Sequence, residues 1–218
     1  MTTSDTRQRI LDTAERLFAE RGFAETSLRT LTREAGVNLA AVHYHFGSKE
    51  QLFVELLSRI VAPVNAERLA RFDAIEAADG EPDLDALIRA FLEPAMALTA
   101  GEDARAETMR QLIGRMQAQR SSMHEEVIHL FREVIDRFLA LLARALPHLD
   151  RPTLLWRMHF LVGAMCFSFA DPKGVEQMSG GACRIGDGSA LVDEMVASFA
   201  GAFRAPEAAR STSNARPA

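Results

Sequence analysis

The chain has 218 residues, 48% of them hydrophobic and 25% charged, and its formal net charge is −5 at pH 7. This length is enough for one large domain, or for a small domain and a larger one. The negative charge excludes a protein that is polycationic overall, so any surface for nucleic acid has to be local. The two cysteines, Cys166 and Cys183, provide no disulfide framework, which fits a reducing compartment.

The sequence predicts neither a signal peptide nor a membrane anchor. Its first residues, MTTSDTRQR, are polar and lack the apolar segment of a signal peptide. The most apolar stretch, residues 158–170, contains His159 and is shorter than the roughly 20 residues that cross a bilayer. We therefore expect a buried helix at this position, no membrane partner and a cytoplasmic location.

Apolar residues recur at helical spacing nearly throughout the chain, and no strand-like alternation is evident, so we predict an all-α fold. The first helix is expected to begin at a Ser4 cap and to end at Gly22. Two short helices are expected next. The first spans about residues 26–35 and starts at a Thr/Ser cap, and the second spans residues 39–46 and starts at Asn38.

A long helix is predicted from residue 49 onward, because Ser48 and Gln51 have the spacing of a capping box. Pro63 lies inside this helix and cannot donate a hydrogen bond to the carbonyl of Arg59, so we expect a bend there. Further helices are predicted at about residues 83–98, 104–118, 122–146, 152–171 and 189–204. Residues 174–190 are rich in glycine and are expected to be mobile.

These patterns predict two domains followed by a tail. Residues 1–50 form a three-helix domain, and residues 51–205 form a larger helical domain. The polar residues 206–218 are expected to be a disordered tail.

The histidines do not predict a metal site. His43 and His45 are two residues apart, which places them on different faces of a helix, and no carboxylate or cysteine lies at ligand spacing. The segment HEEVIH, residues 124–129, has its histidines five residues apart, about 140° around a helix, so they do not share a zinc ion.

A catalytic site or a phosphate-binding loop is not predicted either. His159 and Cys166 are seven residues apart, or about 10 Å along a helix, which is beyond hydrogen-bonding reach. The loop of residues 181–188 has Asp187 where a phosphate-binding loop needs lysine. We expect no catalytic residue, no metal and no cofactor, and we do not expect an enzyme.

The segment of residues 26–49 predicts a helix-turn-helix that binds DNA. Gly36 suits the turn, and Val37 fills the angle between the two short helices. Val42 and Phe46 anchor the second helix, whose other side chains point outward toward base edges and phosphates. The residues predicted from this arrangement to contact DNA are Thr26, Ser27, Arg29, Leu39, Ala40, His43, Tyr44 and Lys49. The alternative is a plain helical corner whose aromatic residues pack inward.

Residues 7–53 resemble the DNA-binding domain of TetR-family transcriptional regulators. The similarity lies in RILDTAERLFAERGFAETSLRTLTREAGVN and in VHYHFGSKEQLF. It implies a homodimer on a pseudo-palindromic DNA operator, and repression that a small ligand relieves. The family's contact positions correspond to Ser27, Arg29, Asn38, Leu39, Ala40, His43, Tyr44, His45 and Lys49. His43, Ala40 and Thr32 replace the usual tyrosine, glycine and alanine, which leaves the operator sequence open.

The C-terminal part is similar to the PsrA-like branch of that family, chiefly through LLWRMHFLVGAMCFSFADPKGV, residues 154–175. This resemblance implies an apolar ligand such as a long-chain fatty acid or its acyl-CoA thioester. The side chains expected to line the ligand site are Met96, Met109, Leu112, Ile113, Met116, Phe131 and Ile135. Arg110, Arg115 and Arg157 are candidates for its charged group. The alternatives are an ordinary apolar core and solvated arginines.

The predicted helix 152–171 is apolar almost all round, so one face can pack in its own domain and another against a second copy. One face carries Trp156, Phe160, Gly163 and Phe167. The other face carries Leu155, Met158, Val162, Met165 and Phe169. We predict that these residues form the dimer interface together with Leu191, Met195, Phe199 and Phe203 of helix 189–204, and the face of helix 152–171 that meets the partner is left open.

The sequence therefore predicts a dimeric DNA-binding regulator that leaves its operator when a small apolar ligand binds. An alternative from another class is a structural or nucleoid DNA-binding adaptor. Such a protein has no ligand, and its larger domain recruits a protein partner.

Overall fold

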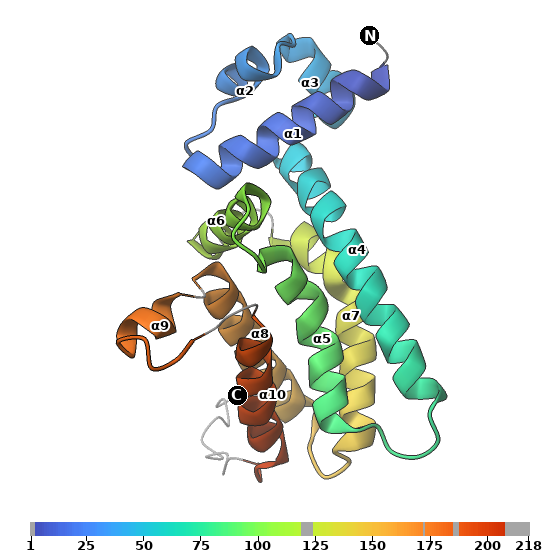
Figure 1. Cartoon of the computed structure of the whole chain (residues 1–218). Helices are drawn as coiled ribbons and strands as arrows, with labels where there is room; N and C mark the ends of the chain where they lie inside the picture. Colours follow the sequence, from blue (N-terminus) through green and yellow to red (C-terminus); the bar gives the residue numbers. More distant parts are fainter. Residues whose placement is uncertain (1–2, 119–123, 172, 185–187, 208–218) are drawn as a thin grey trace, which may run out of the picture.

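The computed structural model describes residues 3–118, 124–171, 173–184 and 188–207. Within these ranges the structure is helical and has no strand, so the predicted all-α fold is confirmed (Figure 1). The helices are α1 (Thr3–Arg21), α2 (Leu28–Ala35), α3 (Leu39–Phe46), α4 (Lys49–Ala77), α5 (Leu84–Thr99), α6 (Ala104–Ala118), α7 (His124–Ala145), α8 (Arg151–Ala170), α9 (Gly174–Met178) and α10 (Ser189–Arg204).

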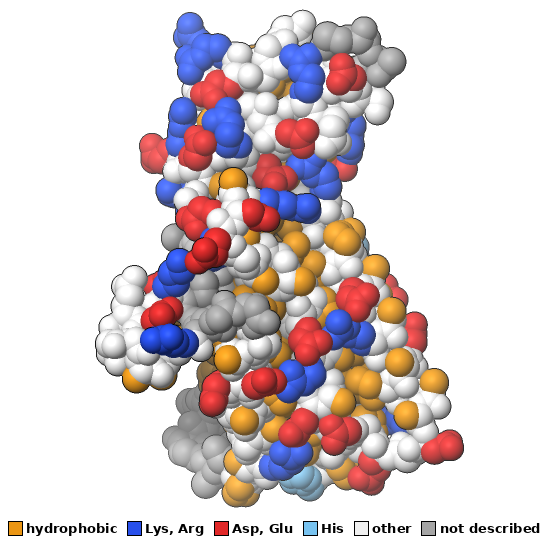
Figure 2. Space-filling view, in the orientation of Figure 1, with side chains coloured by type: hydrophobic (Ala, Val, Ile, Leu, Met, Phe, Trp, Pro, Cys, Tyr) orange, Lys and Arg blue, Asp and Glu red, His pale blue; other side chains and the backbone are white. Residues whose placement is uncertain are grey.

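The molecule has a small head and a larger domain. We call α1–α3 with the first turns of α4 the head, and the remaining helices with the rest of α4 the larger domain. Figure 1 shows α4 running from the head along the side of the larger domain, while α6 lies beneath α1. Figure 2 shows charged side chains of both signs crowding the head, whereas hydrophobic side chains are more frequent over the larger domain.

The short helices begin where the sequence predicts, because each has a side-chain cap. Ser27 Oγ accepts a hydrogen bond from Thr30 N at 3.1 Å, and Asn38 Oδ1 accepts one from Ala41 N at 2.8 Å. Ser48 Oγ accepts from Gln51 N at 3.0 Å at the start of α4. These bonds satisfy amide groups that have no partner within the helix.

Other predicted boundaries need correction. Ser4 is not the cap of α1, because it lies within the helix. Pro63 lies inside α4 without ending it, and the bend there stays a prediction. Residues 174–178, predicted to be part of a mobile loop, form α9, and residues 185–187 of that loop lie outside the described residues.

The beginning of the predicted tail is held against the body of the protein. Pro206 O accepts a hydrogen bond from Arg157 Nη2 at 2.9 Å. Glu207 Oε1 accepts one from the backbone N of Asp150, the cap of α8, at 2.8 Å. The rest of the predicted tail, residues 208–218, lies outside the described residues.

Two apolar clusters hold the protein together. The head cluster joins residues of α1–α3 to Leu52, Phe53, Leu56 and Leu57 of α4, and it also contains Met109 and Leu112 of α6. The second cluster gathers buried side chains of α4, α5, α7, α8 and α10 around Phe138 and Phe91. Because α6 belongs to the larger domain and yet packs into the head cluster, burial of its side chains couples the two domains.

Candidate nucleic-acid interface and its connection to the larger domain

The turn between α2 and α3 is fixed by glycine and by an arginine of α1. Gly36 has a φ of 62°, a left-handed conformation that costs glycine little. A Cβ at this position would also lie 2.9 Å from Arg9 Nη2. Arg9 donates to the carbonyl oxygens of Ala35 and Gly36, so α1 clamps the turn. The angle between the two short helices is therefore set by the backbone and by α1 together.

The helix α3 has one buried face and one exposed face, as the sequence predicts. Val42 and Phe46 are buried in the head cluster. Tyr44 is 79% exposed and Leu39 is 47% exposed, and Ala40 is exposed as well. The residues on the exposed face near the start of the helix are small or apolar, which permits close approach to base edges.

His43 is exposed and its ring is oriented by its own helix end. Its Nδ1 lies 2.8 Å from Gly47 O. Because a carbonyl oxygen only accepts, Nδ1 carries the hydrogen and Nε2 is the acceptor in the neutral ring. In the neutral ring Nε2 therefore accepts hydrogen bonds and does not donate to a phosphate.

His45 and Lys49 are less available than the sequence suggests. His45 is half-buried, with its ring 5.1 Å from the ring of Tyr44 and 6.0 Å from that of Phe46. Lys49 Nζ lies 4.2 Å from the centre of the Phe23 ring, a cation–π contact. Partial burial lowers the pKa of Lys49 below its usual value. Lys49 covers the α1–α2 loop in this state, and its ammonium would have to leave Phe23 to reach DNA.

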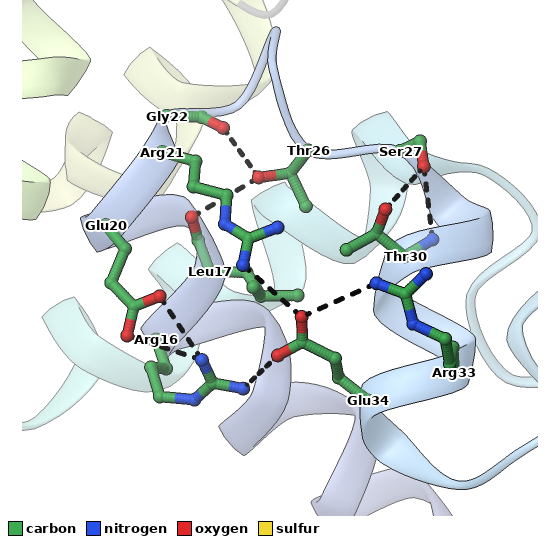
Figure 3. A network of polar contacts seen from close by, with 10 residues as sticks. All are labelled: Arg16, Leu17, Glu20, Arg21, Gly22, Thr26, Ser27, Thr30, Arg33 and Glu34. Carbon is green, nitrogen blue, oxygen red and sulfur yellow. Dashed lines mark hydrogen bonds and ion pairs between the residues drawn. The ribbon is translucent and has the colours of Figure 1, made fainter.

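Thr26 corrects the predicted contact set. Its side chain is fully buried, and its hydroxyl lies 2.8 Å from Gly22 O and 3.3 Å from Leu17 O, as a donor to both. The two hydrogen bonds of this hydroxyl stabilise the turn after α1 (Figure 3). Ser27 is exposed, but its Oγ caps α2.

Arg29 of α2 is an exposed arginine of the head. Among the described arginines of residues 3–50, it is the one whose guanidinium makes no hydrogen bond or ion pair, and it is exposed. The remaining five, Arg7, Arg9, Arg16, Arg21 and Arg33, contact carboxylates or backbone carbonyls. Arg29 thus keeps its charge and its donors for a ligand of the head.

A carboxylate of α2 ties that helix to α1. Glu34 forms ion pairs with Arg16 and Arg21 of α1, and its carboxylate also lies 4.0 Å from the guanidinium of Arg33 (Figure 3). The hydrogen bond from Arg16 holds the pKa of Glu34 below its ordinary value of 4.5. The network fixes α2 relative to α1 and neutralises arginine charge that would otherwise contribute to the field of the head.

The larger domain is attached to α1 of the head by two arginines, one near the C-terminal end of α1 and one at its middle. Arg115 of α6 donates to Ala19 O at 2.7 Å and to Glu20 O at 2.6 Å, near the C-terminal end of α1. Arg59 of α4 pairs with Asp12 at 2.7 Å and Glu15 at 2.5 Å in the middle of α1. Charged hydrogen bonds therefore link both α6 and α4 directly to α1.

The residues predicted to line a ligand site do not lie together. Met109 and Leu112 pack in the head cluster, whereas Met96 and Ile135 pack in the second cluster. Ile113 and Phe131 are half-buried, and the side chain of Met116 lies outside the described residues. Spacing along single helices did not reveal that α6 turns its apolar face toward α1.

The three arginines suggested for a charged ligand group are occupied by the protein itself. Arg157 donates to Phe203 O at 2.7 Å and to Pro206 O, so it joins α8 to the end of α10. Arg110 donates to Thr99 O and Gly101 O, at the end of α5, and Arg115 holds α1. Among the described residues, no group of three or more His, Cys, Asp or Glu side chains is arranged to hold a metal ion.

Most of the side chains of α8 and α10 that are predicted at the dimer interface are buried within their own chain. Met158, Met165 and Phe169 are buried in the second cluster of their own chain, as are Met195 and Phe203 of α10. Leu155 is 39% exposed, and the remaining predicted side chains, Val162, Leu191 and Phe199, are half-buried. The exposed stripe consists instead of Trp156, Phe160 and Phe167, which are 61%, 58% and 76% exposed, with Gly163 between them.

Helix α8 is long and apolar. Among the described residues it is the helix that could cross a membrane by length and composition, and 28% of its apolar window is buried. The low buried share follows from the exposed aromatic stripe. A shallow hollow at its N-terminal end is lined by Pro152, Leu155, Trp156 and His159.

Comparisons with known proteins match both domains. Residues 10–56 match the family described as bacterial regulatory proteins, tetR family, and residues 89–202 match the tetracyclin repressor-like C-terminal domain. The HTH-type transcriptional repressor AcnR of Corynebacterium efficiens is 31% identical over 159 residues, which cover 64% of this chain and 82% of that protein. The HTH-type transcriptional regulator AcrR of Shigella flexneri is 46% identical over 52 residues, which cover 24% of each chain.

Solved structures share the fold along nearly the whole length. The fatty acid degradation regulator FadR from Bacillus halodurans superimposes with a TM-score of 0.63 at 15% identity, covering 92% of this chain and 97% of that one. Such regulators bind operator DNA through the N-terminal helices and are typically homodimers. The matches to both domains, with the helix-turn-helix described above, show that this chain belongs to the TetR family of DNA-binding transcriptional regulators, which are mostly repressors and not enzymes.

Proposed function

We propose that the protein is a homodimeric repressor that leaves a pseudo-palindromic operator when a small apolar ligand binds in the larger domain. The observation that carries this proposal is the contact between α6 and the head. Arg115 holds the end of α1, and Met109 and Leu112 are buried in the head cluster. Because these two side chains are buried in the head cluster, a movement of α6 changes the packing of the head.

The proposed DNA surface is the exposed face of α3 together with the start of α2. Leu39, Ala40 and Tyr44 approach base edges and the adjoining backbone, and Arg29 contacts a guanine or a phosphate. Asn38 and Ser27 position the two helices through their caps, and their exposed N-terminal amides approach phosphates. His43, His45 and Lys49 stay in the proposed set after the rearrangements that their contacts require.

The proposed dimer forms through the exposed stripe of α8. Trp156, Phe160 and Phe167 present large apolar rings to solvent, and Gly163 lets a second backbone approach closely. Pairing this stripe with its copy about a twofold axis buries all three rings. The same pairing sets the separation of the two heads, which has to match the half-sites of the operator.

The proposed coupling follows the chain of contacts from α6 to α1. A ligand that binds among the helices of the larger domain displaces α6 or α4. The displacement reaches α1 through Arg115 and Arg59 and changes the spacing of the two heads. A preference of the ligand of about 1–3 kcal/mol for the displaced state alters operator affinity from severalfold to over a hundredfold.

The ligand that we propose is a long-chain fatty acid or its acyl-CoA thioester. The support is the similarity of residues 154–175 to a branch of the family associated with such ligands, together with the fold shared with a fatty acid degradation regulator. Because operator DNA lies in the bacterial cytoplasm, we place the protein there.

The proposal is tested by operator binding in the presence of small molecules. The dimer is bound to duplex DNA from upstream of its own gene, and fluorescence anisotropy is measured across a broad library of apolar compounds. We expect at least one class to release the DNA. Operator binding that no compound changes would favour a ligand-independent adaptor, which recruits a protein partner, over a ligand-released repressor.

A further inference from the structure

The larger domain contains a buried arginine that has no carboxylate partner. Arg68 of α4 is 2% exposed and lies between α5 and α8. Its Nε donates to Phe91 O at 2.8 Å, and its Nη2 lies 3.6 Å from Met165 Sδ. Its guanidinium carbon is 4.1 Å from the centre of the Phe91 ring. Within the described residues, no Asp or Glu lies within ion-pair distance of it.

This arrangement leaves one nitrogen of the guanidinium without a hydrogen-bond partner among the described residues, and a second one bonded only to a thioether sulfur. Nε is used by Phe91 O, whereas Nη1 makes no hydrogen bond to any described residue. The edge formed by Nη1 and Nη2 is the one that binds a carboxylate through two parallel hydrogen bonds. A carbonyl, a thioether and an aromatic ring satisfy part of the hydrogen-bonding capacity of Arg68, but they supply no negative charge.

Burial without an acidic partner disfavours the charged form of Arg68. Burial lowers the pKa of Arg68 to about 10, and the single described group whose charge opposes that effect is the thiol of Cys166 on α8. A thiol carries its charge only when it is deprotonated. Buried ionised groups in proteins are normally paired, because removal of a lone charge from water costs several kcal/mol.

A second unpaired polar atom lies one turn earlier on the same face of α4. Asn65 is 9% exposed, and its Nδ2 donates to Leu130 O at 2.9 Å. That bond fixes the orientation of the amide, and Oδ1 is then buried with no donor from any described residue. Asn65 Oδ1 requires a hydrogen-bond donor that the described residues do not provide.

We propose that Arg68 is the counter-charge for the carboxylate of the ligand that releases the repressor, and that the ligand is an apolar molecule with a single carboxylate. A single negative charge balances one arginine, whereas a phosphate dianion would leave an excess charge in an apolar core. Phe91 and Met165 beside the guanidinium then contact the apolar body. This inference rests on the proposed ligand-released function, and it assigns the head group to Arg68 rather than to Arg110, Arg115 or Arg157.

The location of Arg68 also connects the ligand to the head. Arg68 is on α4, the helix whose first turns lie in the head cluster and whose Arg59 pairs with α1. A carboxylate that binds Arg68 interacts directly with a side chain of α4 and can displace that helix. The ligand therefore needs no separate relay to reach the DNA-binding helices.

The test compares straight-chain carboxylates of graded length with the primary alcohols of the same lengths, using the melting temperature of the full-length dimer. Ligand binding to the folded state raises this temperature. We expect at least one carboxylate to raise it and the matched alcohol to do so far less. Equal effects of acid and alcohol, or no effect of any carboxylate, would overturn the proposal.

The variant Arg68→Met separates a binding role from a structural one. Methionine fills similar volume without charge, so we expect an unchanged or higher melting temperature without ligand and at least a tenfold weaker response to the carboxylate. The control Arg157→Met loses hydrogen bonds to Phe203 O and Pro206 O and is expected to keep the response. A variant at Arg68 that melts lower without ligand, or that still responds fully, would contradict the proposal.

A third arm distinguishes this inference from the proposed function. Operator release is measured with the same carboxylates and with neutral and cationic apolar compounds. Release by neutral or cationic compounds alone overturns the role of Arg68 and leaves the ligand-released repressor intact. Absence of release by every compound overturns both.

Discussion

Arg115 of α6 donates to Ala19 O at 2.7 Å, across 96 positions of the sequence and from one domain to the other. The bond, with its companion to Glu20 O at 2.6 Å, caps the C-terminal end of α1, where carbonyl oxygens have no partner within the helix. A cation at that end also interacts favourably with the helix dipole. The orientation of the head is thus tied to a helix of the larger domain by one side chain.

Replacement of Arg115 should uncouple the head from the larger domain. We expect Arg115→Ala to lower the free energy of unfolding by about 1–2 kcal/mol, because charged hydrogen bonds are lost, and to reduce the ligand-induced change in operator affinity. Chemical denaturation and anisotropy measure the two effects. Arg105, also on α6, is exposed and makes no hydrogen bond or ion pair with a described residue, so Arg105→Ala is the matched control and should change neither.

Arg29 and Thr26 lie three positions apart in the sequence. Substitution of Arg29 should reduce operator affinity, whereas substitution of Thr26 should reduce stability. Arg29→Ala removes the exposed guanidinium that has no partner within the head, so we expect the free energy of operator binding to weaken by about 1–3 kcal/mol with unchanged stability.

Thr26→Val leaves two carbonyl oxygens without the hydrogen bond from the buried hydroxyl, so the free energy of unfolding should fall by about 1–3 kcal/mol. Its operator affinity, measured well below the unfolding temperature, should stay close to that of the wild type. A selective loss of DNA binding in Thr26→Val would return Thr26 to the contact set.

The contrast between these two residues shows what the sequence can and cannot predict. The caps Ser27, Asn38 and Ser48 are local signals, since each bonds to an amide three residues later, and all three are confirmed. The hydroxyl of the buried Thr26 bonds to Leu17 O of the preceding helix and to Gly22 O just after it, and no local pattern distinguishes Thr26 from Ser27. The helix-turn-helix was therefore predictable, whereas the burial of Thr26 was not.

The larger domain was less predictable because its decisive features are tertiary. Both sides of α8 are apolar, so the sequence had no basis for choosing the side that faces the core. Arg68 stands between Glu67 and Leu69 in a long charged helix and looks like a solvated residue in the sequence. Its burial arises because α5 and α8 pack over it.

Acid should weaken the connection between α1 and α2. The hydrogen bond from Arg16 lowers the pKa of Glu34 below 4.5, so the native state favours the carboxylate form. The stability that this provides is complete above the pKa of Glu34 in the unfolded chain and is lost as the pH falls through its lower value in the folded protein. Glu34→Gln should be less stable than wild type at neutral pH, and the difference should disappear at a pH well below 4.5. A difference that persists there would assign the effect to packing instead.

The exposed stripe of α8 should decide the oligomeric state. We expect Phe167→Glu to convert the dimer into monomers and to abolish operator binding, because buried carboxylates in an apolar interface are strongly unfavourable. Analytical ultracentrifugation measures the change in mass. Met178 of α9 is 90% exposed and lies outside the stripe, so Met178→Glu is the control that should remain dimeric. A variant at Phe167 that stays a dimer would move the interface elsewhere.

The central claim is that two copies present α3 to successive major grooves of one operator, and a footprint of the full-length protein on DNA from upstream of its own gene tests it most directly. We expect two protected half-sites that are related by approximate twofold symmetry and separated by about 34–36 Å along the duplex or a multiple of it. Arg29→Ala should weaken both half-sites equally. Protection of a single half-site, or no protection even at low ionic strength, would contradict the account.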